Sequence, residues 1–317
     1  MTDNTTWQGD APEPTRNGVL VDGEQVVLLR GGQLRAVALR SGARRWQIDS
    51  DSHAIYPVAP GFILATERTG SGGHWDLIDA QTGQRRWRRS FSVALDPAPW
   101  HAAGVLWGLH HATNAADTTL EATDLHDGTV IRALPAPHIQ QTGGTDGTLW
   151  ATQYAHGSAR PGLSRLRSGK WEAISAAPHE LIAADAHGVV VLQRGQPWTV
   201  CAYAHDGQVP LWRQVGEGPF VVRDDAVLIA AELTVHCIER HTGTRRWSRT
   251  LSGEEDIISL SAAGERVYAE AWAGPHAVLD PQTGAVLATA PEGPREALDA
   301  GAWVVLVSDE QLRVTPS

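Results

Sequence analysis

A glycine turn recurs seven times along the 317-residue chain, and its spacing constrains the fold more than any other feature. Each glycine follows a Ser, Thr or Asp, whose side chain can hydrogen-bond the backbone of a tight turn, and glycine itself tolerates a positive φ. The turns follow one another at intervals of roughly 40 residues, which is the length of one supersecondary unit in a repeat protein. The turn glycines are Gly42, Gly83, Gly128, Gly169, Gly207, Gly243 and Gly284.

The segments before each turn have the pattern of short β-strands. An apolar residue stands six positions before each turn glycine, and a second apolar stretch lies further upstream, as in QVVLLR (25–30) and AVLIAAE (226–232). Such stretches, rich in aliphatic and β-branched residues and bounded by turn formers, are typical of strands. Short antiparallel strands in units of this size cannot bury both faces alone. We therefore expect an all-β chain whose units are the blades of a β-propeller, each a four-stranded antiparallel sheet.

The two ends of the chain decide the number of blades. After the last complete unit, the C-terminal segment still supplies an inner strand, WVVLVS (303–308) and QLRVT (311–315), and then stops. The N-terminal TTWQGD (5–10) resembles the outer strand RRWQID of the first unit. We expect this strand, at about residues 5–10, to complete an eighth blade, so that residues 1–317 form a single propeller domain. Seven blades, with Trp7 outside the ring, is the alternative.

The repeats LIDAQTGQRRW and VLDPQTGAVLA resemble the ALDAxTGxxxW repeat of pyrroloquinoline-quinone-like (PQQ-like) β-propellers. This superfamily includes quinoprotein dehydrogenases and assembly lipoproteins of the BamB type. The resemblance covers nearly the whole chain and implies that the tryptophan of the repeat packs against the neighbouring blade. Trp46, Trp87 and Trp247 match that position, and Trp7, Trp171 and Trp212 match it approximately. The third and seventh units carry Arg132 and Ala288 there instead.

The same resemblance implies PQQ only for the dehydrogenases, which carry a vicinal cysteine pair over the cofactor. This chain has two cysteines, Cys201 and Cys237, which are not adjacent, so we expect no PQQ. Their matching positions before consecutive turns indicate buried apolar residues. The BamB-type proteins are exported and lipidated, and neither signal is visible in this sequence.

Charge and hydropathy exclude several classes of partner. The net charge of −10 repels polyanions, so we expect no nucleic-acid partner. No apolar run is long enough to cross a bilayer, so we expect no membrane partner. The polar start MTDNTTWQGDAPEPTRNG lacks the features of a secretory signal, and we expect a cytoplasmic protein.

Histidines are the most informative chemical feature that remains. In a propeller, the loops that enter each blade and those between its second and third strands share one face, here called the top face, and most of the 14 histidines fall in these loops. Imidazoles that converge with carboxylates can hold a divalent transition metal or supply a general acid and base near neutral pH. The candidate catalytic residues are His53, His138, His179, Asp96 and Asp256, and the three histidines are also the candidate metal ligands. The candidate ligand-binding residues are His110, His111, His156, Arg160 and Trp107.

Two functional hypotheses follow. In the first, the His-rich top face binds a small molecule, with metal-assisted or His/Asp acid–base chemistry of the lyase, isomerase or oxidative kind. In the second, the propeller is a non-catalytic scaffold that binds a protein partner at the top face, and the histidines are ordinary solvated loop residues. No local motif separates the two hypotheses, because ligands taken from different blades are far apart in the sequence.

Overall fold

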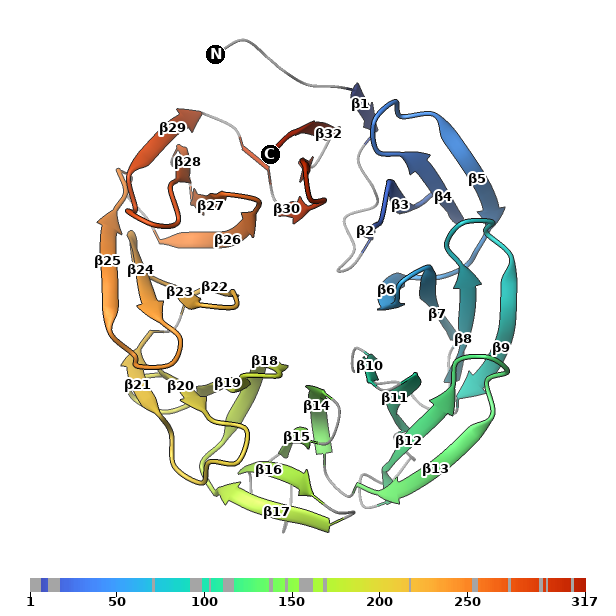
Figure 1. The fold of residues 1–317 in the computed structure, drawn as a ribbon, viewed down its shortest axis with the longest axis horizontal. Coiled ribbons are helices and arrows are strands. Elements are labelled where there is room, and N and C mark those ends of the chain that lie inside the picture. Colours follow the sequence, from blue (N-terminus) through green and yellow to red (C-terminus); the bar gives the residue numbers. More distant parts are fainter. Residues whose placement is uncertain are drawn as a thin grey trace.

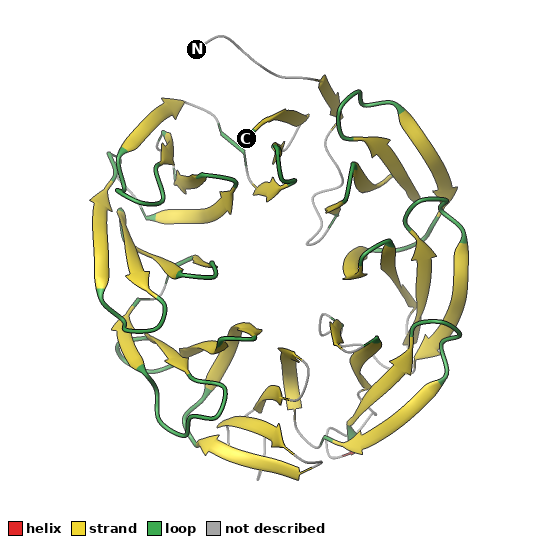
Figure 2. Ribbon diagram, in the orientation of Figure 1, coloured by secondary structure: helices red, strands yellow, loops and turns green. Residues whose placement is uncertain are grey.

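A computed structural model describes residues 7–10, 18–69, 72–91, 99–102, 104–110, 117–136, 139–145, 148–153, 162–167, 170–216, 218–252, 256–272, 275–290, 293–294, 296–308 and 311–317. Eight four-stranded antiparallel sheets stand in a ring, and the innermost strand of each sheet faces the axis (Figure 1). The strands are joined by turns and loops, with no α-helix in the part of the chain that is described (Figure 2). The predicted all-β, eight-bladed propeller is confirmed.

The strands of each blade follow one another from the axis outward. Blades 1 to 4 contain β2 (Val19–Asp22), β3 (Gln25–Arg30), β4 (Gln33–Ala38) and β5 (Arg44–Asp49); β6 (Ala54–Ala59), β7 (Phe62–Thr69), β8 (Gly72–Asp79) and β9 (Arg85–Phe91); β10 (Trp100–Ala102), β11 (Val105–His110), β12 (Thr119–Asp124) and β13 (Val130–Pro135); β14 (Ile139–Thr145), β15 (Thr148–Gln153), β16 (Gly162–Arg167) and β17 (Lys170–Ser175). Blades 5 to 8 contain β18 (His179–Asp185), β19 (Gly188–Gln193), β20 (Thr199–Tyr203) and β21 (Trp212–Val215); β22 (Phe220–Val222), β23 (Ala226–Ala231), β24 (Thr234–Glu239) and β25 (Arg245–Thr250); β26 (Ile257–Ala263), β27 (Arg266–Ala271), β28 (His276–Leu279) and β29 (Val286–Ala290); β30 (Glu296–Asp299), β31 (Trp303–Val307), β32 (Gln311–Pro316) and β1 (Trp7–Asp10).

The eighth blade joins the two ends of the chain. Strand β1 pairs antiparallel with β32, in a register that runs from Trp7 opposite Val314 to Asp10 opposite Gln311. The N-terminal strand is therefore the outer strand of the last blade, and the seven-bladed alternative is wrong. The strand begins at Trp7 among the described residues, whereas the first part of the predicted segment, residues 5 and 6, lies outside them.

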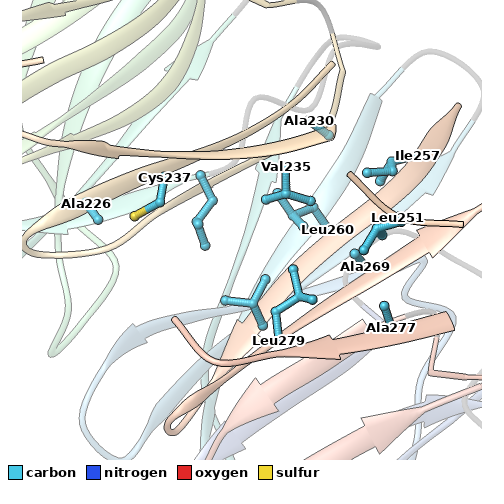
Figure 3. Close-up of a cluster of buried hydrophobic side chains, with 12 residues drawn as sticks. Ala226, Ala230, Val235, Cys237, Leu251, Ile257, Leu260, Ala269, Ala277 and Leu279 are labelled. Carbon is cyan, nitrogen blue, oxygen red and sulfur yellow. The ribbon is translucent and has the colours of Figure 1, made fainter. Parts of the chain in front are cut away.

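The hydrophobic core is divided among the junctions between neighbouring blades. At the junction of blades 6 and 7, for example, Val235 and Cys237 from β24 pack with Leu260 from β26 and Leu279 from β28 (Figure 3). Burial of apolar area stabilises a fold by roughly 25 cal/mol per Å². Because each sheet is buried on both faces between its neighbours, the second strand of a blade can be continuously apolar, as β23 (AVLIAA) shows.

The predicted tryptophan contacts hold these junctions together. The indole N–H of Trp46 donates to the carbonyl of Ala80 in the turn of blade 2 at 2.7 Å, and that of Trp87 reaches the carbonyl of Leu125 in blade 3 at 3.0 Å. The ring of Trp46 also lies against Gly83, where an added Cβ would stand 2.8 Å from it. The turn glycine therefore provides the left-handed backbone and the space for the ring. Trp212 and Trp247 make the same contact, with indole donation to the carbonyls of Arg240 and Pro281.

Five of the seven predicted turn glycines have positive φ values of 67° to 75°, namely Gly42, Gly83, Gly128, Gly243 and Gly284. Gly207 lies in the corresponding turn between β20 and β21, and Gly169 lies outside the described residues.

Blade 4 departs from the rule. The indole N–H of Trp171 donates backward, to the carbonyl of Pro135 in blade 3, at 3.1 Å. The contact with blade 5 is made by Arg165 on β16, whose guanidinium donates to the carbonyl of His205 at 2.9 Å and to the carboxylate of Glu172 at 2.8 Å. The Arg165 side chain is only 2% exposed and lies over the ring of Trp150. A buried cation thus takes the place that an indole has at the junctions after blades 1, 2, 5 and 6.

The arginines that precede the repeat tryptophan lie on the outermost strands, as Arg86 on β9 and Arg246 on β25 show. Arg246 forms an ion pair with Asp225 of its own blade, and Arg86 pairs with Asp79 at 2.5 Å. Both pairs are on the outer surface of their blades, where water screens them, so we expect each to contribute less than about 1 kcal/mol to stability.

Candidate functional site

The loops of the top face are held to one another by backbone hydrogen bonds. In blade 1, the N–H of Ser50 after the outer strand donates to the carbonyl of Gly32 between the second and third strands at 2.8 Å. In blade 6, the N–H of Leu251 donates to the carbonyl of Leu233 at 2.9 Å. These bonds show that the loops entering each blade and the loops between its middle strands share one face.

His179 is the most deeply buried of the described candidate histidines. It is the first residue of β18, its side chain is 6% exposed, and its ring meets Tyr203 edge-on. Its Nδ1 lies 2.5 Å from the carbonyl oxygen of Ala177, and a carbonyl can only accept, so Nδ1 carries the proton. Burial lowers the pKa of His179, and the positive charge of Arg213 lowers it further. The imidazole is therefore neutral at pH 7, with its Nε2 lone pair available.

The three described candidate catalytic residues, His53, His179 and Asp256, lie in three blades that do not adjoin one another. His53 is half-buried directly before β6 in blade 2, and blade 2 is not a neighbour of blade 5 in the ring (Figure 1). Asp256 is exposed directly before β26 in blade 7, where its carbonyl accepts from the N–H of Trp272. His138 and Asp96 lie outside the described residues. Within the ranges that the structure describes, no three His, Cys, Asp or Glu side chains are grouped so that they could hold a metal ion.

The candidate ligand-binding residues that are described take part in contacts between blades. His110, the last residue of β11, has its Nε2 3.2 Å from a carboxylate oxygen of Glu121, and its ring packs edge-on against Trp75. Glu121 also forms an ion pair with Arg89 of blade 2. Trp107 stacks on Trp100, with 5.6 Å between ring centroids and 7° between the planes.

His111, His156 and Arg160 lie outside the described residues. The described part of this group therefore belongs to a polar and aromatic contact between blades 2, 3 and 4.

Two features of the site region are not among the candidate site residues predicted from the sequence. The first is Trp272, at the top end of blade 7, whose side chain is 57% exposed, and Ile258 on the innermost strand of the same blade is also exposed. Ile258 sits where the register between β26 and β27 shifts, and such a bulge turns a side chain out of the regular alternation. Tryptophan in a loop carried no positional signal that would have predicted its exposure.

The second missed feature is a groove between blades 6 and 7, with a volume of about 270 Å³. One wall comes from the end of blade 6, with Arg249 and Leu251, and the other from blade 7, with Ala277 and Val286. Leu251 and Ala277 also belong to the interblade cluster drawn in Figure 3. Thr250, Ser252, Pro275 and Thr289 complete the lining. The signal that could have predicted it is the series of small residues in VLATA, where other outer strands carry Arg and Trp.

The cysteines do not fit a quinone site of the dehydrogenase kind. Cys201 on β20 and Cys237 on β24 are buried in the cores of different blade junctions. Burial raises the pKa of the Cys237 thiol to about 11, so it is protonated at neutral pH.

The eight blades, their 40-residue repeat and the indole contacts define a PQQ-like β-propeller. The family described as "Outer membrane protein assembly factor BamB" matches residues 30–210 and 198–317, and the chain belongs to this family. A comparison with curated protein sequences found no match. The described residues include no helix with the length and apolar character needed to cross a bilayer.

Several solved structures share the fold. The computationally designed Ika8 protein has a TM-score of 0.69 at 15% identity, with 97% of this chain and 98% of that chain covered. The C-terminal WD40 domain of Sif2 has a TM-score of 0.69 at 12% identity, with 99% and 97% covered. The quinohemoprotein alcohol dehydrogenase of Comamonas testosteroni has a TM-score of 0.63 at 9% identity, with 98% and 76% covered. At these identities the similarity concerns the fold alone.

Proposed function

We propose that this propeller is a non-catalytic scaffold that binds a protein partner through the top face of blades 6 and 7. The observation that carries the proposal is Trp272, whose indole is more than half exposed, whereas the other described tryptophan side chains are buried or half-buried. Tryptophan is enriched among the residues that dominate binding energy at protein interfaces. Ile258 adds a second exposed apolar side chain on the same blade.

Two further points support a binding role. Trp272 is held by its backbone, since its N–H donates to the carbonyl of Asp256 at 3.0 Å, so the indole is presented from a fixed loop position. A rigid aromatic side chain loses little conformational entropy on binding. The family description names an assembly factor, which agrees with a protein that acts by binding other proteins. The cytoplasmic location expected from the N-terminal sequence stays part of the proposal and is tested by cell fractionation.

Site-specific photo-crosslinking tests the scaffold proposal in cells. The full chain is produced with p-benzoylphenylalanine at position 272, and in a control at position 209, because Val209 is an exposed residue on the outer side of blade 5. We expect a discrete crosslinked species from position 272 and none from position 209. Equal crosslinking from both positions, or none from position 272, would refute the proposal. The same species should be lost from affinity purifications of Trp272→Ala.

A second candidate function, small-molecule binding at the His-rich top face, is favoured by one observation. Nε2 of His179 is buried and has no hydrogen-bond partner among the described residues. A neutral imidazole with a buried lone pair is a metal ligand or a proton acceptor. This candidate includes the metal-assisted or His/Asp acid–base chemistry expected from the sequence, with a divalent transition metal as its cofactor.

Elemental analysis of protein purified without a His tag tests the second candidate. Stoichiometric metal that is lost from His53→Ala, His138→Ala and His179→Ala, while circular dichroism shows the fold intact, would support a metal-dependent ligand site. Metal-free protein, with no effect of these changes on ligand-induced stabilisation, would leave the scaffold as the function.

A further inference from the structure

Strand β29 differs from the outermost strands of the other blades. Outer strands have one unpaired edge, and proteins protect such edges with charged side chains, especially in long strands. In the eight outermost strands that the structure describes, β29 (VLATA) is alone in having no charged residue. The other seven are WQGD, RRWQID, RRWRRSF, VIRALP, KWEAIS, WRQV and RRWSRT.

The edge of β29 is open to another chain. In its sheet, the strand order is β26-β27-β28-β29, so β29 is hydrogen-bonded on one side only. Leu287 is 52% exposed, and Val286 next to it is exposed as well. Because the unpaired N–H and C=O groups of a strand edge are satisfied by an extended backbone, the chemistry of this edge selects a β-strand as its occupant.

The groove between blades 6 and 7 runs beside this edge. Val286 and Thr289 of β29 form part of its lining, so alternate side chains of a strand added outside β29 would lie at its mouth. At the positions of Val286 and Thr289, the outer strand β25 of blade 6 carries Arg245 and Ser248, so β29 leaves this side of the groove uncharged. Its volume of about 270 Å³ accommodates side chains of a partner rather than single waters.

The charge of the groove further restricts which side chains the partner segment can carry. Among the eight described residues that line it, Arg249 is the one that carries a charge. Its Nε donates to the carbonyl of Gly284 at 2.7 Å, which fixes the guanidinium against blade 7. A fixed guanidinium favours a carboxylate partner, and the lining by Leu251, Pro275 and Val286 favours apolar neighbours of that carboxylate.

We propose that β29 is a strand-addition site for an extended segment of a partner protein, in which an acidic residue flanked by β-branched or aliphatic residues places its carboxylate at Arg249. The backbone pairing provides affinity, and the groove provides specificity for the acidic side chain. This surface is on the outer rim, so the inference goes beyond the top-face scaffold proposed above and stands or falls separately from it.

A random heptapeptide library displayed on phage is the probe, and the immobilised full chain is the target. We expect the enriched peptides to share an acidic residue with aliphatic neighbours. Synthetic copies should bind the parent protein in fluorescence polarisation, and the backbone amides of residues 286–290 should exchange more slowly with deuterium in the complex. Slower exchange of these amides is the signature of strand pairing, which side-chain docking in the groove alone would not produce.

Three variants give the comparison. Leu287→Lys adds a protective charge to the edge and should weaken binding by about tenfold or more. Arg249→Gln should weaken the binding of acidic peptides by about threefold and leave the binding of their amide analogues unchanged. Ile131→Lys adds the same charge to β13, another exposed outer strand, and should leave binding within about twofold of the parent. Melting temperatures establish that each variant folds.

Four results would overturn the proposal. They are failure to enrich any peptide above background, binding that survives Leu287→Lys, peptides without an acidic preference, and unchanged amide exchange in β29. A dimer that forms in light scattering and is abolished by Leu287→Lys would assign the edge to a second copy of this chain instead. Crosslinking at position 272 is not involved in any of these outcomes, so the two proposals are tested independently.

Discussion

Replacing Trp46 with alanine should be among the most costly single changes in the ring. The indole is 9% exposed in the core between blades 1 and 2, and its N–H donates to the carbonyl of Ala80 at 2.7 Å. Truncation of a buried tryptophan to alanine costs about 3–5 kcal/mol, because it removes apolar burial and leaves a cavity. The same change removes one of the two side-chain donors to the Ala80 carbonyl, the other being the amide of Gln25. We expect a loss of about 4 kcal/mol in the free energy of unfolding.

Two companion variants divide this loss into its parts. Trp46→Phe keeps most of the ring in place and removes the N–H donor, so it should cost about 1–2 kcal/mol. Trp171→Ala removes an indole that is half-buried and donates backward to Pro135, so it should cost about 1–2 kcal/mol. The contact geometry therefore predicts that Trp46→Ala lowers the free energy of unfolding more than either Trp46→Phe or Trp171→Ala does.

Scanning calorimetry at pH 7 provides the measurement. The entropy of unfolding is about 2.1 cal/mol/K per residue, which for 317 residues gives about 0.7 kcal/mol/K. A loss of 4 kcal/mol should then lower Tm by about 6 °C, and a loss of 1–2 kcal/mol by about 2 °C. If Trp46→Ala lowers Tm by less than about 2 °C, or by no more than Trp171→Ala does, then the indole contacts do not hold the blades together and the reasoning is wrong.

Three further predictions concern stability. Gly243→Ala would place a Cβ 2.4 Å from the Cβ of Trp212 at a φ of 72°, and should cost about 3 kcal/mol of unfolding free energy in the same calorimetry. Gly31→Ala is the control, because Gly31 has a φ of 58° and open space around it, and should cost about 1 kcal/mol. Equal losses would contradict the role of the tryptophan ring. Arg165→Met should cost about 2 kcal/mol in urea unfolding, because it removes the buried donor that joins blades 4 and 5, and an unchanged midpoint would refute that role. The pKa of His179 is lowered in the folded state, so the unfolded chain binds more protons there, and stability should fall as the pH drops below about 6.5. His179→Leu should flatten the dependence of Tm on pH between pH 7.5 and 5. An identical slope in the parent protein and the variant would contradict this prediction.

The ring could be predicted because its determinants are local. A Thr-Gly turn with a tryptophan four residues later encodes the left-handed backbone and the indole that fills the space beside the next glycine, and both facts lie within one short segment. The closure by β1 could be predicted because the chain ends one strand short of a blade. Trp171 stands two residues after its turn glycine, whereas Trp46 stands four residues after its own, so the spacing marked Trp171 as an approximate match. The direction of its contact could not be predicted, since Arg165 occupies the next junction.

The sequence predicted which face of the propeller carries the candidate residues, but not which of these residues lie close together. Loops entering the blades were correctly assigned to the top, because strand alternation decides that. Whether His53 and His179 converge depends on which blades carry them, and blades 2 and 5 do not adjoin. The groove beside β29 is lined by uncharged side chains of that strand. Sequence reasoning that looks for chemically reactive residues does not single out such a strand.

Closure of the ring by β1 affects how the protein folds during its synthesis on the ribosome. Strand β1 is synthesised before its partner β32, and the first seven blades lie between the two in the sequence. At about 5–20 residues per second, β1 waits roughly 15–60 s for its partner. During that time the nascent chain carries an unpaired strand next to a growing row of blades, and that strand is a potential pairing site for other nascent chains. The step that completes the eighth blade therefore also ends the period in which aggregation during synthesis competes with folding.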